Sequence, residues 1–426
     1  MMDATEADTA ADDLLAAQVA LAEIFLTPAG NEDPYSRYRL LHERSPVTPS
    51  GDGGLVLVRY DDCQEVLREN RLGKNFDPTR EIPGAGGHDP EILAYRRAMA
   101  ERRRDAPLSM LAANPPDHTR IRSLVSRAFT PRRVEQMRSH IVDLAEECFD
   151  QMAEARELDL LEALGFPLPV SVIGELVGVP RADWGRFRRL ISASAAALEA
   201  AATIAELEDA EAATTEVFAY FADLVAQKRQ HPGDDLLSGM IEASDGGDRL
   251  TEGEVIVQAV LMFAAGFETT TNLIGNGVVA LLTHPDQMAA LWADPALVVP
   301  AVEEILRFDS PVQLDARTTN EAMDVAGVAV DEGARIITLL GAANRDPTRF
   351  DDPDVFDIGR DQGPPLSFAS GIHYCLGANL ARAEGQVVLD GLVRRFSRIE
   401  LTGELVHRHR VTLRGYEAVP VRVTPN

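Results

Sequence analysis

Apolar residues recur at helical spacing along most of the chain, which predicts a mainly α-helical protein. Helices are expected at residues 14–25, 34–43, 61–69, 131–154, 171–177, 181–195, 205–230, 251–284 and 378–396. Shorter apolar runs next to turn residues predict strands at 47–49, 55–58, 325–330 and 334–340, and a terminal hairpin at 411–414 and 419–423. The stretch 71–116 is irregular and is expected to be a long loop.

No linker rich in Pro, Gly or Ser divides the 426 residues, so one domain spanning 1–426 is expected, with a large helical part and a smaller β-rich lobe. The acidic, Ala-rich residues 1–12 are expected to be disordered.

The predicted helix 251–284 has an unusual centre. It opens with the capping box Thr251–Glu254, stops at Pro285 and would be about 50 Å long. Gly266 and three consecutive threonines are poor helix formers, and a Thr hydroxyl can bond a carbonyl one turn back and bend the helix. A plain kink in a core helix would explain these residues. It would not explain Glu268, because an ionisable group in an apolar helix is costly unless it is paired or functional.

A second candidate site is the loop Phe368-Ala-Ser-Gly371-Ile-His373-Tyr-Cys375-Leu-Gly377, directly before the helix 378–396. A thiol at a helix N-terminus is favoured as the thiolate, which is the form that binds metal. A single cysteine cannot build a zinc or iron–sulfur site, but it can supply one axial ligand of a haem. The alternative is a buried free cysteine that packs as a small apolar residue.

Composition excludes several classes of partner. Asp and Glu number 68 against 41 Lys and Arg, a net charge of −27, which argues against binding nucleic acid or an anionic membrane. The three cysteines are far apart in sequence, which fits a reducing cytoplasm. The N-terminus does not have the pattern of a signal peptide, and no run of 18 apolar residues occurs. We therefore expect a cytoplasmic, monomeric protein.

The pattern F-x-x-G-x-x-x-C-x-G, with His two places before Cys, resembles the haem-binding loop of the cytochrome P450 superfamily. Ala369 stands where many bacterial members have Gly, and we expect a small change in loop geometry without loss of ligation. The resemblance extends over almost the whole chain. It includes Pro115-Pro116-Asp117-His118 with Arg122, the stretch 264–271 and Glu304-Ile-Leu-Arg307.

The resemblance implies a role for each matching residue. Cys375 would be the axial ligand of the iron of haem b. The other haem-binding residues would be His118, Arg122, Ala265, Arg317, Phe368, His373 and Gly377, with His118, Arg122 and Arg317 at the propionates. Thr269 would hydrogen-bond O₂ and Glu268 would relay protons to it. Glu304 and Arg307 would be structural.

The implied activity is a haem-thiolate monooxygenase that inserts one oxygen atom of O₂ into a C–H or C=C bond. Electrons would come ultimately from NAD(P)H, through a ferredoxin reductase and a ferredoxin docked near Arg120, Arg127 and Arg132. A peroxide-driven peroxygenase and a catalytically silent haem-binding protein are the alternatives, and both leave the Glu268–Thr269 pair unexplained.

The substrate is expected to be a medium-to-large, mostly apolar molecule from bacterial secondary metabolism, similar to a polyketide, a macrolide or a terpenoid. The candidate contact residues are Met110, Phe267, Val312, Gln313, Leu314, Thr412 and Leu413. The Ala-rich stretch 192–203 would lie near a lid over the pocket.

Overall fold

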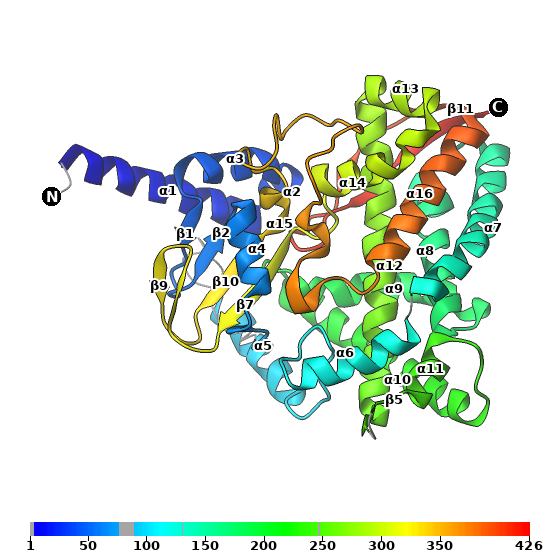
Figure 1. Cartoon of the computed structure of the whole chain (residues 1–426), viewed down its shortest axis with the longest axis horizontal. Helices are drawn as coiled ribbons and strands as arrows, with labels where there is room; N and C mark the ends of the chain where they lie inside the picture. Colours follow the sequence, from blue (N-terminus) through cyan, green and yellow to red (C-terminus); the bar gives the residue numbers. More distant parts are fainter. Residues whose placement is uncertain (1–3, 76–88, 130, 246–247) are drawn as a thin grey trace.

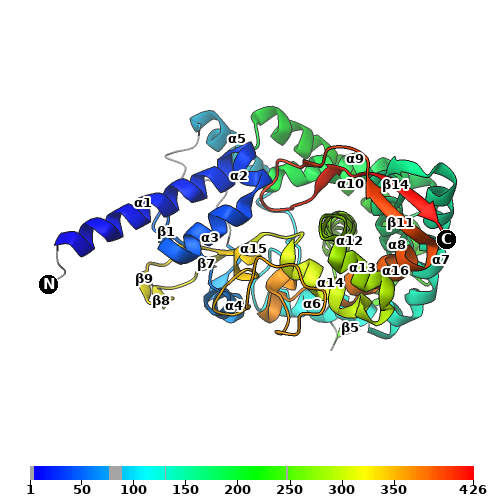
Figure 2. The same ribbon diagram turned by 90° about the horizontal axis from the view of Figure 1, so that it is seen from above.

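Helix α12 (Glu252–Thr283) is the axis of the molecule. The computed structural model describes residues 4–75, 89–129, 131–245 and 248–426. In Figure 1, α12 crosses the molecule from end to end, and the view along it in Figure 2 shows it surrounded by other elements. The predicted capping box is present: Thr251 accepts a hydrogen bond from the Glu254 N–H, and the Glu254 carboxylate accepts one from the Thr251 N–H.

Helices make up most of the chain, as predicted. Besides α12 they are α1 (Ala4–Leu26), α2 (Pro28–Glu32), α3 (Pro34–Arg44), α4 (Tyr60–Arg68), α5 (Pro90–Arg102), α6 (Asp117–Ala128), α7 (Pro131–Ala155), α8 (Pro167–Val177), α9 (Trp184–Ala195), α10 (Ile204–Gln230), α11 (Leu236–Glu242), α13 (Pro285–Ala293), α14 (Val298–Phe308), α15 (Leu340–Ala343) and α16 (Ala378–Arg395). Short helical turns are η1 (Leu161–Gly165), η2 (Arg181–Asp183), η3 (Ala196–Leu198), η4 (Pro295–Leu297), η5 (Leu366–Phe368) and η6 (Gly371–His373). Within the described residues, no helix combines the length and apolar character needed to cross a bilayer.

The strands form a smaller lobe and several short ribbons. They are β1 (Val47–Pro49), β2 (Leu55–Leu57), β3 (Leu72–Gly73), β4 (Glu157–Asp159), β5 (Ser244–Asp245), β6 (Asp248–Arg249), β7 (Leu314–Thr319), β8 (Met323–Val325), β9 (Val328–Val330), β10 (Arg335–Leu339), β11 (Phe396–Leu401), β12 (Val406–His407), β13 (Tyr416–Ala418) and β14 (Pro420–Pro425). The main sheet has five strands in the order β1-β2-β10-β7-β3, in which β10 is parallel to β2 and the other pairs are antiparallel.

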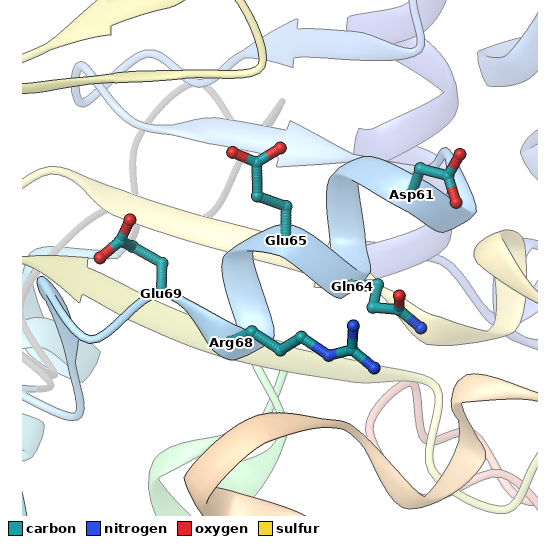
Figure 3. Close-up of a pocket in the computed structure, with 5 residues that line it drawn as sticks. All are labelled: Asp61, Gln64, Glu65, Arg68 and Glu69. Atoms are coloured by element: carbon teal, nitrogen blue, oxygen red, sulfur yellow. The ribbon is translucent and has the colours of Figure 1, made fainter.

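Two segments that were expected to be non-helical contain helix. Of residues 1–12, which were expected to be disordered, 4–12 form the start of α1, which projects from the body in Figure 1, and 1–3 lie outside the described residues. Alanine, which is frequent in this stretch, favours helix. The stretch 71–116 contains α5, and its Pro-Gly-Ala-Gly-Gly segment lies outside the described residues. Helix α5 has little apolar periodicity, but the Asp89 carboxylate accepts a bond from the Glu91 N–H and marks its start.

The predicted terminal hairpin was also wrong. Strand β14 pairs with β11 and β4 in a three-stranded sheet, and residues 411–414 form no strand. Strand β7 was not predicted as a strand; it pairs with β10 and β3. Apolar alternation indicates that a segment is a strand, but it does not identify distant pairing partners.

Candidate haem-thiolate site

The cysteine loop is held in a fixed position against α4. The Cys375 N–H donates to the Phe368 carbonyl at 3.0 Å, which closes the loop in front of α16. Gly371 has φ +69°, and a Cβ there would lie 2.4 Å from the Leu67 carbonyl oxygen of α4. Only glycine fits this position. The loop therefore presents Cys375, which is exposed, at the N-terminal end of α16.

The electrostatic surroundings of Cys375 act in two directions. Desolvation raises the pKa of the thiol, while the Gly377 N–H and the guanidinium groups of Arg122 and Arg382 favour the thiolate and lower this pKa. Arg122 is tied to the loop, because its Nη2 donates to the Tyr374 carbonyl at 2.6 Å. Desolvation is the larger effect, so the pKa of the free thiol is raised, and the cations and the helix N-terminus beside it oppose this rise.

Ala369 bears backbone strain within this loop. Its φ of 57° and ψ of −157° lie in a region that is almost restricted to glycine. The alanine thus occupies a backbone conformation that favours glycine, the residue that many bacterial members have here.

We expect Ala369→Gly to stabilise the protein by roughly 1 kcal/mol, because relief of about 1–3 kcal/mol of strain exceeds the entropy that glycine adds to the unfolded chain. The unfolding midpoint of the haem-loaded protein, measured by circular dichroism, tests this. Ala326→Gly is the control, since Ala326 also has positive φ (48°) but lies in the turn between β8 and β9. A lower midpoint for Ala369→Gly would contradict the assignment of strain.

Four donor side chains gather beside this loop. His118 (α6) and His373 have ring centroids 4.3 Å apart, and Arg317 (β7) and Arg122 influence both rings electrostatically. His118 and Arg317 are each 2% exposed. Burial, with a smaller contribution from nearby arginines, lowers the pKa of His118 and that of His373, the latter to about 3.

Several of these buried nitrogen atoms have no hydrogen-bond acceptor in the described part of the chain, namely both ring nitrogens of His118 and both Nη atoms of Arg317. Among the described residues, Arg317 Nη1 lies 3.0 Å from Asp315 Oδ1 as an ion pair that does not have hydrogen-bond geometry. Unsatisfied buried donors are costly, so this arrangement is suited to anionic acceptors such as a pair of carboxylates. The donor set therefore fits the propionates of a haem.

The centre of α12 presents a small-residue face and a hydroxyl. Ala265 is exposed, and Thr269 follows one turn later on the same face. The Thr269 Oγ1 donates to the Ala265 carbonyl at 2.6 Å, the bond to the preceding turn that the sequence predicts. The helix nevertheless continues without interruption to Thr283. Thr269 keeps lone pairs on Oγ1 that can accept a further hydrogen bond.

Glu268 is buried, as predicted, and it is paired. Its Oε1 accepts from Arg408 Nη1 at 3.1 Å and from Arg410 Nη1 at 2.8 Å. Its Oε2 is buried with no partner among the described residues. Burial raises the pKa of Glu268, and the two arginines oppose this rise. Neither arginine was predicted from the sequence, although the closely spaced basic residues of His407-Arg408-His409-Arg410 were a visible signal.

Some predicted substrate contacts lie together. Val312 and Leu413 form an isolated β-bridge, and the Gln313 N–H donates to the Thr412 carbonyl at 3.1 Å, so 312–314 runs beside 412–413. Val312, Leu314, Thr412 and Leu413 are all partly exposed. Met110 is held to α12, because its N–H donates to Gln258 Oε1 at 2.8 Å.

Two predicted contacts were wrong. Phe267 is 2% exposed, packs against Phe166 and lies on the opposite side of α12 from Ala265. Gln313 is 1% exposed, and its side chain accepts from the Tyr38 hydroxyl at 2.9 Å and donates to the Ser310 carbonyl at 2.7 Å. The amide group of Gln313 is thus used within the protein and does not anchor a substrate.

A surface hollow lies on α4, and one of its lining residues, Arg68, donates through Nε to Ser370 Oγ of the cysteine loop at 2.9 Å. Figure 3 shows its lining side chains, Asp61, Gln64, Glu65, Arg68 and Glu69, which include none of the predicted site residues. On the predicted docking face, Arg120 is paired with Glu254, Arg127 is exposed, and the side chain of Arg132 lies outside the described residues.

Known proteins resemble this chain over nearly its full length. The family model described as Cytochrome P450 matches residues 205–300 and 296–408. Cytochrome P450 107B1 of Saccharopolyspora erythraea is 41% identical, with 92% of this chain and 95% of that protein covered. The 6-deoxyerythronolide B hydroxylase of the same organism is 38% identical, with coverages of 92% and 96%.

Solved structures agree with this result. Ligand-free CYP164A2 of Mycobacterium smegmatis superposes with a TM-score of 0.84 at 36% identity, covering 95% of this chain and all (100%) of that one. The Bacillus subtilis bacillaene polyketide synthase cytochrome P450 PksS has a TM-score of 0.80 at 34% identity, with coverages of 93% and 98%. The fold, the donor set around Cys375 and these relatives lead to one conclusion: the chain belongs to the cytochrome P450 family and is a bacterial-type, haem-dependent monooxygenase that uses O₂.

Proposed function

We propose that Cys375 is the axial haem ligand and that the enzyme oxidises a polyketide- or macrolide-like small molecule, using Thr269 and Glu268 for proton delivery. The observation that carries the proposal is the set of buried, unsatisfied donors of His118 and Arg317 beside the Cys375 loop. These donors would hold the propionates, together with Arg122 and His373. Phe368, Ala265 and Gly377 would lie against the ring. The bound haem supplies the oxygen-activating chemistry.

The protein's own contribution is to place the substrate and to control protons. Thr269 Oγ1 stands on the α12 face that carries Ala265, where it can accept and pass on a proton. Glu268 supplies an ionisable group next to it whose pKa is raised by burial. A raised pKa brings a carboxyl closer to the value at which it both binds and releases protons near neutral pH.

The substrate class is supported by the candidate wall and by the relatives. Met110, Val312, Leu314 and Leu413 are apolar, and Thr412 is the remaining polar candidate, which suits a weakly polar ligand. The related 6-deoxyerythronolide B hydroxylase and PksS carry polyketide chemistry in their names. A screen of macrolides, linear polyketides and terpenoids tests this. A binder displaces the haem's distal ligand, shifts the Soret band and gives an oxygenated product; binding by terpenoids alone would contradict the proposed class.

The electron supply is proposed to be a ferredoxin, reduced from NAD(P)H by its reductase in the cytoplasm. A small acidic protein is suited to a face of α6 that exposes Arg127, despite the chain's net charge of −27. NADH-dependent turnover with reconstituted ferredoxin and reductase separates this assignment from peroxide-driven chemistry.

We expect Thr269→Ala to consume NAD(P)H while forming roughly 100-fold less product per electron pair, because a positioned proton donor is lost. Product yield, peroxide release and NAD(P)H oxidation are measured together. Thr269→Ser should restore most of the yield.

Thr283→Ala is the matched control for this experiment. Thr283 lies at the C-terminal end of α12, and its Oγ1 donates to the Val279 carbonyl at 2.8 Å, as Thr269 does to Ala265. It should leave the product yield unchanged. Equal losses in the two variants would show that the threonine serves only the helix.

A further inference from the structure

The segment between α9 and α10 is attached to the C-terminal part of the chain by a buried carboxylate. Glu199 follows η3 and is 7% exposed. Its Oε2 accepts from the Val411 N–H at 2.8 Å, and its Oε1 accepts from the Thr412 N–H at 3.2 Å. Thr412 in turn donates through Oγ1 to the Leu198 carbonyl at 3.3 Å. Residues 196–199 therefore lie directly on the 411–412 backbone.

Arg410, directly before Val411, bonds both α12 and the end of α9. Its Nη1 donates to Glu268 Oε1 at 2.8 Å, and its Nη2 donates to the Ser192 carbonyl at 2.7 Å in the last turn of α9. Burial raises the pKa of the Glu199 carboxyl, and the charge of Arg410 is one of the influences that oppose this rise. The Arg410 guanidinium group thus donates hydrogen bonds to α9 and to Glu268 of α12, and it acts electrostatically on Glu199 in the segment after α9.

Two buried acids interact through this arginine. Charged and titratable groups that act on Glu268 are Arg410 and Arg408, which lower its pKa, and Glu199 and Glu417, which raise it. Arg408 bonds the same Oε1 atom, but its other contacts are the Phe166 ring and the 414–417 region, with an electrostatic influence from Arg188 in the first half of α9 and none recorded from residues 192–199. Arg410 therefore has a connection to the 192–199 region that the structure does not record for Arg408.

We propose that Arg410 is a positioning residue that couples the placement of the segment 196–203 to the orientation of the Glu268 carboxylate. Movement of this segment away from residues 411–412 breaks the bonds of Glu199 to Val411 and Thr412, the two residues after Arg410. If the end of α9 moves with the segment, the Arg410 bond to Ser192 is also lost, and the position of the guanidinium group against Glu268 changes. Removing Arg410 leaves Glu268 with Arg408 as its remaining bonded cation and takes away a charge that favours the Glu199 carboxylate, so both the segment and the acid are held less firmly. This inference rests on the proposed role of Glu268 in proton delivery, but its test does not depend on turnover.

Hydrogen exchange of the haem-loaded full chain, read by mass spectrometry, measures the coupling from the acid to the segment. Because coupling is reciprocal, Glu268→Gln should accelerate exchange by about tenfold in peptides that cover residues 196–203 and the amides of Val411 and Thr412. Arg410→Gln should accelerate exchange in the same peptides by a similar factor. Arg408→Gln is the matched control, since it removes the same charge from the same carboxylate; it should leave the segment protected. The proposal is overturned if Glu268→Gln leaves exchange in 196–203 unchanged, or if Arg408→Gln accelerates it as much as Arg410→Gln.

A second readout follows Glu268 itself. Its carboxylic C=O stretch, identified by its loss in Glu268→Gln, is titrated by infrared difference spectroscopy. Arg410→Gln should raise the midpoint by about 1–3 pH units, because a neighbouring cation is removed. Arg410→Lys should restore most of the midpoint but not the segment's protection, since one ammonium group cannot reproduce the fork that reaches both Glu268 and Ser192. An unshifted midpoint in Arg410→Gln would rule out the positioning role even if the enzyme remains active.

Discussion

Cys375→Ser is expected to abolish monooxygenase turnover and to remove the red-shifted ferrous carbonyl band of thiolate-ligated haem. The loss of turnover rate should exceed the roughly 10–100-fold loss that follows removal of a residue that only hydrogen-bonds a metal ligand, because the variant lacks the proposed axial ligand itself. The absorption spectrum of the reduced carbonyl complex and the rate of product formation are the two measurements.

Cys148→Ser is the control for this prediction. Cys148 is 6% exposed in the main core, and burial raises the pKa of its thiol to about 11, so it stays a neutral, packed thiol. This variant should keep the red-shifted band. Retention of that band in Cys375→Ser, or its loss in Cys148→Ser, would contradict the assignment of the ligand.

Arg307→Ala is expected to destabilise the protein by about 3–5 kcal/mol, because it leaves the buried Glu304 charge without its main partner. Arg307 and Glu304 form a two-pronged pair, with Nε–Oε2 at 2.7 Å and Nη2–Oε1 at 2.8 Å, and their side chains are 2% and 1% exposed. Arg307 also donates to the carbonyls of Asn344, Pro353 and Val355. The pair thus fastens α14 to the 344–357 stretch before the cysteine loop.

The matched control is Arg104→Ala. Arg104 and Glu101 have the same spacing of three residues, but their side chains are 69% and 62% exposed, so the loss should stay below about 1 kcal/mol. Thermal and urea unfolding of the haem-loaded proteins give the comparison. If Arg307→Ala does not fold, Arg307→Lys provides a second measurement, since lysine keeps the charge but cannot form two parallel bonds. Equal stability losses for Arg307 and Arg104 would contradict the structural role.

Much of the helical framework could be predicted from local sequence. The start of α12 follows from Thr251 and Glu254, which cap each other within one turn, and its end follows from Pro285. Gly371 signals a backbone conformation that other residues avoid, and the structure shows φ +69° there. These features depend on residues that are close together in the chain, so a pattern of a few residues is sufficient to predict them.

Other features depend on partners that are distant in sequence. Asp61 and Asp62 predict a local cap for α4, yet the Tyr60 N–H is bonded at 2.7 Å by the carboxylate of Asp346. The partners of β14 likewise lie in β11 and β4. Prediction from local sequence fails for Phe267 and Gln313 for the same reason. Their residue types fit a binding pocket, but contacts with residues distant in the chain bury them in the core.

The sequence by itself determined which residues we propose for the chemistry: one cysteine in a glycine-containing loop, a Glu–Thr pair in a long helix, and basic residues at the spacing of one helix face. Only the tertiary structure decided what holds them, namely that Arg408 and Arg410 pair with Glu268 and that His118 and Arg317 face inward without acceptors. Residue type and spacing specify bonds within a helix or a turn. The energy of a buried charge, in contrast, depends on which distant groups replace its lost water, and the folded chain alone determines that arrangement.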